Sequence, residues 1–342
     1  MAKWPLADLA IRFGMSSERF EGLPANVVVS FDVSKAAGVE QIIVDVDAGA
    51  GRLPMGSNGV AVDDLKLKAA YAASTDTLSI DAQTSGAGPL KGNAVLTIQD
   101  AMKGDGFRRF KLASPELELD FTPRFEHPIA ISRLTLAGEV DLANYAFRGA
   151  ELTLQTGADT LKASGAFQLT PDRKPGEPQI IGSLDFASEG DLSRETVLAF
   201  WPVQLGDGAR RFAVNRVTAG VVTSAEGHID LLRDSLAEGY LRDENLQLDF
   251  TVRDAAVRFL DDLPAVENAA GKGQLTGNGF KVVVESGDYG GWVLDDGVVD
   301  FPAFNPKGVP FRVCAKGHGP ATNVMKTLAE SRLQSKFDPA RL

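Results

Sequence analysis

The chain has 342 residues, of which 44% are hydrophobic, and a formal net charge of −11 at pH 7. This apolar content can build a large core and excludes global disorder. The acidic balance argues against nucleic-acid binding, which needs clustered lysine and arginine, and against a polybasic membrane-surface patch. No stretch approaches the roughly 20 apolar residues that span a bilayer, and residues 1–9 have no apolar signal-peptide core. We therefore expect either a cytosolic protein or part of a longer chain whose targeting segment lies elsewhere.

Alternating apolar and polar residues run through the first 190 positions, most clearly at residues 65–68, Leu-Lys-Leu-Lys. This period of two predicts β-strands, and the Gly-, Ser- and Asp-rich segments between them predict turns. The expected strands are residues 26–33, 41–47, 65–72, 77–83, 93–99, 117–121, 133–142, 150–156, 161–169 and 179–187. Such short connections indicate an antiparallel meander with one apolar and one polar face.

A helical interruption is predicted between residues 193 and 220. Trp201-Pro202 should end a short amphipathic helix at residues 193–200, because proline lacks the backbone N–H and its ring clashes with the preceding turn. Asp207 is expected to cap a second short helix. That helix would carry Arg210, Arg211 and Phe212.

Strands resume after this segment, at residues 221–232, 245–252, 272–276, 280–285, 291–294, 297–301 and 309–316. Residues 255–260 are expected to form a short helix or an irregular edge. A final helix is predicted at residues 321–331, after Gly319-Pro320, because proline suits a first helical turn. We therefore divide the chain into β sections at residues 1–114, 115–190 and 221–342 and a helical turn segment at 191–220, all within one continuous elongated unit.

So many strands, each apolar on one face, must hide that face from water. One solution is a sandwich or closed barrel whose interior fills with side chains. The other is a single twisted sheet that curls into a trough with an apolar lining. The residues leave both solutions open. The side chains expected on the apolar face are Leu65, Leu67, Leu78, Ile80, Leu134, Leu136, Leu152, Leu154, Leu246, Leu248 and Phe250.

Candidate catalytic and metal-binding groups are sparse. His127, His228 and His318 are far apart without ligand-like spacing, which argues against a zinc site. The single cysteine, Cys314, lies in an alternating run and is expected to be a strand residue. Acidic pairs such as Asp63-Asp64 fall at turns, where aspartate bonds to nearby backbone. We expect no catalytic residue, no metal and no cofactor.

Two ordered sets of residues carry a family resemblance. The first is Phe200-Trp201-Pro202 followed by residues 209–212, Ala-Arg-Arg-Phe, then Asn215 and Gly220. The second is the succession of turns from residue 259 to Gly319-Pro320. Together they resemble the turn pattern of AsmA-like proteins, specifically the YhdP-type branch of Gram-negative envelopes, over roughly residues 192–342. The repeat-turn motif would then consist of Trp201, Pro202, Phe212, Asn215 and Gly220.

This resemblance implies a mainly β fold, an elongated, twisted antiparallel sheet of repeated β-meanders that curls into a hydrophobic groove, with short helices between repeats. It also implies a non-catalytic, lipid-conducting module that carries phospholipid between inner and outer membrane. The protein would be periplasmic and tethered by an inner-membrane anchor outside this chain, with no nucleic-acid partner.

Arg210 and Arg211 have two interpretations. They could contact a lipid phosphate at the groove rim, since guanidinium binds phosphate in bidentate fashion. Alternatively, they cover the end of the sheet with their stems packed on apolar surface. For the whole chain, the alternative function is a structural envelope-biogenesis scaffold with a filled β-sandwich core, and a third is a carbohydrate-active enzyme.

Overall fold

The computed structural model describes residues 4–5, 24–35, 38–53, 60–86, 88–102, 106–122, 124–170, 174, 177–178, 180–203, 207–235, 237, 240–259, 261 and 263–330. In these residues, nineteen strands belong to one large antiparallel sheet that does not close on itself, and two short strands form a separate pair. This confirms the mainly β, antiparallel fold class. The chain divides into two compact units, residues 1–184 with 231–233, and residues 185–230 with 234–342. The four sections drawn from the sequence stay a prediction.

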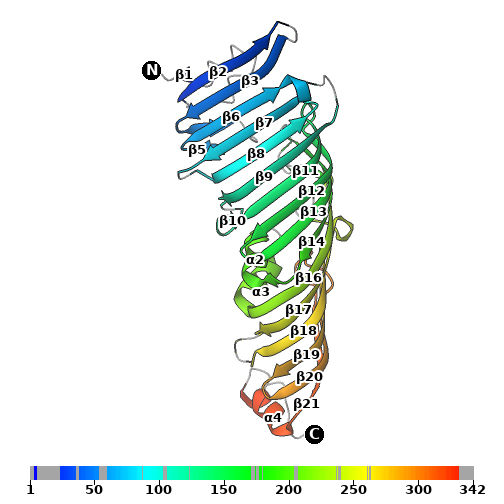
Figure 1. The fold of residues 1–342 in the computed structure, drawn as a ribbon. Helices are drawn as coiled ribbons and strands as arrows, with labels where there is room; N and C mark the ends of the chain where they lie inside the picture. Colours follow the sequence, from blue (N-terminus) through cyan, green and yellow to red (C-terminus); the bar gives the residue numbers. More distant parts are fainter. Residues whose placement is uncertain are drawn as a thin grey trace. The chain divides into compact units, whose positions relative to one another are not determined.

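Unit 1 is a meander in which successive strands pair with their neighbours (Figure 1). Its strands are β1 (Trp4–Pro5), β2 (Pro24–Ser34), β3 (Gly38–Ala48), β4 (Gly51–Leu53), β5 (Val60–Val62), β6 (Leu65–Ala72), β7 (Thr77–Thr84), β8 (Leu90–Gln99), β9 (Arg108–Leu119), β10 (Ile129–Ile131), β11 (Arg133–Asp141), β12 (Ala146–Thr156), β13 (Asp159–Leu169) and the first half of β14 (Ile180–Glu189). The pairing order is β1, β2, β3, β6, β7, β8, β9, β11, β12, β13. The short β10 pairs with the end of β9, while β4 pairs with β5.

Unit 2 repeats this antiparallel plan. Its strands are the second half of β14, β15 (Leu192–Ser193), β16 (Val217–Leu231), β17 (Leu246–Val257), β18 (Val266–Thr276), β19 (Phe280–Tyr289), β20 (Trp292–Phe301) and β21 (Arg312–His318). From β16 to β21 each strand pairs with the next one along the chain. Among the described residues of unit 2, three α-helices accompany these strands, α2 (Arg194–Phe200), α3 (Asp207–Arg216) and α4 (Ala321–Glu330).

Helices α2 and α3 confirm the predicted interruption between strands (Figure 1). Helix α2 begins after Ser193, whose side chain accepts a hydrogen bond from the Thr196 backbone N–H at 3.1 Å. It ends at Phe200, and Trp201 is its C-cap, just before the proline. Helix α3 begins at Asp207, so the predicted capping residue is the first residue of the helix. The predicted final helix is confirmed as α4, and Ser331, its expected last residue, lies outside the described residues.

The expectation for residues 255–260 is wrong in its first half. Residues 255–257 continue β17, with Ala255 opposite Ala269 and Val257 opposite Val266. The ladder shifts register just before Ala255, and Asp254 has a positive φ of 53°. A bulge of this kind lets a strand resume after an irregular step. The sequence disruption therefore marks a bulge within one strand.

Candidate functional site

A continuous row of apolar side chains crosses unit 1 perpendicular to its strands. The row follows from the pairing registers, because directly opposed residues in antiparallel strands project from the same face. In order from β2 to β13 its members are Val29, Val44, Ala69, Ile80, Leu96, Leu112, Leu136, Leu152 and Ala163. We call this set the central row. All of its members except the exposed Val29 are half-buried.

A second row runs beside the central one on the same face and contains Phe31, Ile42, Tyr71, Leu78, Ile98, Phe110 and Gly138. Here the packing is tighter, since Ile98, Phe110 and Val140 form a buried cluster. On the other side of the central row, Ala48 and Leu65 belong to another buried cluster, with Ala25 and Val62. The central row thus lies between two packed cores while its own side chains keep part of their surface accessible.

The predicted apolar-face residues of unit 1 all lie on this one face. Ile80, Leu136 and Leu152 belong to the central row, Leu78 belongs to the second row, and Leu65 and Leu67 lie toward the first cluster. Leu134 and Leu154 are opposed to one another on β11 and β12. Leu65 and Leu154 are buried, whereas the others are half-buried.

Sequence reasoning missed Leu96 and Leu112 of the central row. Leu96 alternates within a predicted strand and could have been found there. Leu112 lies in the first part of β9, which was not predicted because Pro115 interrupts the alternation. The ladder between β8 and β9 shifts register between Asn93 and Val95, close to this proline.

The apolar face of unit 2 contains the remaining candidates. Leu246 is buried, Leu248 and Phe250 are half-buried, and all three alternate along β17. Phe250 begins a set of aromatic contacts that crosses the strands: its ring centroid lies 6.1 Å from that of Phe280, which lies 6.3 Å from that of Phe301. No charged residue occurs among the cross-strand partners of these aromatic and aliphatic positions.

Glycine is required where rings of this face lie flat across a neighbouring strand. A Cβ atom on Gly273 would come within 2.1 Å of Phe250 Cζ, and one on Gly227 within 2.3 Å of Phe186 Cζ. Real Cβ atoms do not approach ring carbons so closely. The two glycines therefore create the space that the rings fill on the apolar face.

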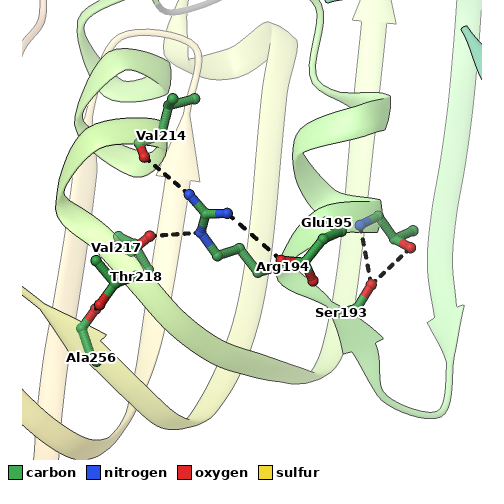
Figure 2. Close-up of polar contacts among 8 residues, drawn as sticks. Ser193, Arg194, Glu195, Val214, Val217, Thr218 and Ala256 are labelled. Atoms are coloured by element: carbon green, nitrogen blue, oxygen red, sulfur yellow. Dashed lines mark hydrogen bonds and ion pairs between the residues drawn. The ribbon is translucent and has the colours of Figure 1, made fainter. Parts of the chain in front are cut away.

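Arg194 fixes the helical segment and is the main polar residue that sequence reasoning missed. As Figure 2 shows, its guanidinium reaches from α2 to the end of α3, where Nε donates to the Val217 carbonyl at 2.6 Å and Nη2 to the Val214 carbonyl at 3.0 Å. The last carbonyls of a helix have no intrahelical partner, so a cation there is stabilising. Its partners lie 20 and 23 positions away, and no local pattern indicates them.

The two arginines predicted to bind a head group differ in environment. Arg210 is only 7% exposed, and its Nε donates to the Trp201 carbonyl at 3.1 Å. Arg211 is exposed. Burial of Arg210 against the turn between α2 and α3 supports the structural interpretation for that residue.

The other residues of the repeat-turn motif lie between the end of α2 and the first part of β16. Pro202 follows the end of α2, and Phe212 packs on Phe259 with ring centroids 5.8 Å apart. Asn215 is exposed on α3. Gly220 has a φ of 142°, and a Cβ atom there would lie 3.2 Å from Ala255 Cα.

His228 lies on the polar face of unit 2 between two carboxylates. His228 Nδ1 lies 2.7 Å from Asp185 Oδ1, and its Nε2 lies 3.1 Å from Asp230 Oδ2. Hydrogen bonding to Asp185 and then to Asp230 raises the pKa of His228 above 6.5. Within the described part of the chain, no group of three or more His, Cys, Asp or Glu side chains could hold a metal ion. None of the described helices combines the length and the apolar character needed to cross a membrane.

Comparison with known proteins gives one family. A family model described as YhdP protein matches residues 65–340, which is most of the chain. No curated protein and no solved structure matches the chain in these comparisons.

Proposed function

The chain belongs to the YhdP family, and from this premise we propose that it is a non-catalytic module that binds phospholipid acyl chains along its apolar face and conducts them. The YhdP family is a family of cell-envelope proteins with a role related to lipid transport. We further propose a periplasmic location, an inner-membrane anchor outside this chain, and transport of phospholipid between the inner and outer membranes.

The observation that carries the proposal is the central row of unit 1. Its nine members are aliphatic, and none is charged or polar. Eight interstrand steps of about 4.8 Å make the row about 38 Å long. The hydrocarbon core of a bilayer, which contains two layers of acyl chains, is about 30 Å thick. The row is therefore long enough for the acyl chains of a phospholipid to lie along it.

The energetics of this row suit a mobile hydrocarbon. Each CH₂ group removed from water contributes about 0.8 kcal/mol, so a long chain adheres without any specific contact. Because the row offers only aliphatic side chains on successive strands, a chain that shifts by one strand exchanges one such contact for another. We propose that lipid moves by this stepwise exchange, without covalent chemistry.

The competing scaffold function requires a filled β-sandwich core. The described strands do not form one, since they belong to a single open sheet apart from the β4–β5 pair. The open sheet favours the lipid-binding function over the scaffold.

The experiment compares two substitutions on neighbouring residues of β11 that face opposite ways. Leu136→Asp places a carboxylate in the central row, whereas Thr135→Asp places one on the polar face. Both positions are half-buried, so Thr135→Asp controls for the effect of charge on the strand. Phospholipid that co-purifies with each protein is measured by mass spectrometry after circular dichroism confirms the fold.

We expect Leu136→Asp to retain several-fold less phospholipid than the unmodified protein, because burying an ionised carboxylate against hydrocarbon is costly. Thr135→Asp should retain the normal amount. Absence of phospholipid from the unmodified protein, or equal amounts in both variants, would contradict the proposal.

A further inference from the structure

Arg108 lies on the apolar face of unit 1. It is the first residue of β9 and lies directly opposite Val140 of β11. Val140 is buried with Phe110, the residue two positions along β9 from Arg108. Residues two apart on a strand share a face, so Arg108 projects from the same side as Phe110 of the second row. It lies two residues closer to the start of β9 than Phe110.

This position is unusual for a charged side chain. In the described residues of β2, β3, β6–β9 and β11–β13, Arg108 is the single lysine or arginine on the apolar face; the others project from the polar face or lie in turns. Its side chain is half-buried, and Nη1 donates to the Gly106 carbonyl at 3.4 Å. A guanidinium at the edge of an apolar surface can bury its stem while its charged end meets an anion.

A carboxylate near Arg108, that of Asp141, forms hydrogen bonds within a turn. Asp141 accepts hydrogen bonds from the Ala143 backbone N–H at 3.0 Å and from Asn144 Nδ2 at 2.8 Å. The bond from Asn144 lowers the pKa of Asp141, and the charge of Arg108 adds to this effect. Asp141 therefore lies within reach of the charge of Arg108, while its oxygens close the β11–β12 hairpin.

The two connections next to the start of β9 carry exposed apolar side chains. Met102, in the connection from β8 to β9, is 69% exposed. Leu142 and Tyr145, in the hairpin from β11 to β12, are 48% and 43% exposed. Since β8 and β11 are the two neighbours of β9, these two connections lie at the same strand ends as Arg108, one on each side of β9. A cation bordered by apolar groups matches the boundary between the phosphate and the acyl chains of a lipid.

We propose that Arg108 binds the phosphate of a phospholipid whose acyl chains lie along the rows of the apolar face. This inference rests on the proposed function and adds the position of the head group. Guanidinium suits this role because its planar N–H groups match two phosphate oxygens. The head group then lies at the ends of the strands, next to solvent, and the acyl chains extend from it across the neighbouring strands.

The test uses delipidated protein and three probes in the same detergent: dioleoyl phosphatidylglycerol, dioleoylglycerol and inorganic phosphate. Arg108→Met keeps an unbranched apolar stem and removes the charge, and Arg108→Lys keeps the charge without the planar fork. Arg109→Met is the matched control, because Arg109 is the next residue and faces the other way, opposite Glu139. Binding is measured by native mass spectrometry.

We expect the unmodified protein and Arg109→Met to bind the phosphate-bearing lipid about tenfold more tightly than dioleoylglycerol, as a charge-assisted contact warrants. Arg108→Met should lose this preference, and Arg108→Lys should retain part of it. If Arg108→Met does not fold, a reduced preference in folded Arg108→Lys supports the proposal and an unchanged preference overturns it.

Three other results overturn the inference. One is an equal lipid preference in the unmodified protein and in Arg108→Met. Another is tight, Arg108-dependent binding of inorganic phosphate alone, which would mark a site for the free ion. If neither lipid binds to the unmodified protein, the proposed function fails as well, so the two failures are distinguishable.

Discussion

Two phenylalanines of the second row provide a direct test of how the apolar face is packed. Phe110 is 7% exposed and packs edge-to-face on Phe147, with ring centroids 5.6 Å apart. Phe31 lies in the same row on β2 but is 59% exposed. The same substitution, Phe→Ala, therefore has different consequences at the two positions.

The expected magnitudes follow from burial. Replacing a fully packed phenylalanine by alanine costs about 3 to 5 kcal/mol, which includes the cavity and the lost ring contact. Fully burying such a side chain is worth about 1.5 to 3 kcal/mol, and less than half of Phe31 is buried, so Phe31→Ala should cost about 1 kcal/mol and leave no cavity. We predict a difference of about 3 kcal/mol between the two variants.

The measurement is the free energy of opening in unit 1, obtained from hydrogen exchange of backbone amides in β8 and β9 for Phe110 and in β2 and β3 for Phe31. Exchange reports each strand pair separately, which suits a chain with two compact units. Comparable losses at both positions would refute the packing described above, because they would mean that the face is covered as fully at β2 as at β9.

Two further predictions concern unit 2. The pKa of His228 is raised by Asp185 and Asp230, so the protonated ring stabilises the fold at pH values below 6.5, and this contribution is lost as the pH rises through the raised pKa. His228→Asn should remove that pH dependence, which urea unfolding at a series of pH values would reveal; identical profiles for both proteins would contradict it. Arg194→Met removes two hydrogen bonds to the end of α3 and should cost about 1.5 to 3 kcal/mol. Hydrogen exchange of α3 checks this, and unchanged protection of the helix would show that Arg194 does not hold it.

The sequence predicts the strands best where alternation is uninterrupted. Residues 65–72 are identified to the residue as β6, because Leu65 and Leu67 alternate with Lys66 and Lys68 at the start of the strand. Prediction fails where a bulge or a proline breaks the alternation while the ladder continues. Asp254 interrupts β17 and Pro115 interrupts β9 in this way. The pairing partner that carries the strand past such a break is not visible in local sequence.

Local sequence predicts the face on which a side chain lies, but it does not predict how deeply that side chain is buried. The alternation of Leu134 and Leu136 predicts that both lie on the apolar face, and the pairing registers place both on one face of the sheet. Local sequence cannot show how much of each side chain is buried, since burial depends on residues that are distant in the chain. Arg108 illustrates the difficulty: it is one of two adjacent arginines with identical propensities, and only its opposition to Val140 sets it apart from Arg109.

The most direct test of the central claim is site-specific photocrosslinking to phospholipid. A benzophenone side chain is placed at Leu96, Leu136 or Leu152 of the central row. The matched controls carry it at an adjacent residue of the same strand, Thr97, Thr135 or Thr153, which faces the other way. Lipid adducts are identified by mass spectrometry after irradiation in cells. The proposed function predicts phospholipid adducts at the three leucine positions and few or none at the threonines. Equal labelling of both sets, or no adduct at any leucine, would contradict it.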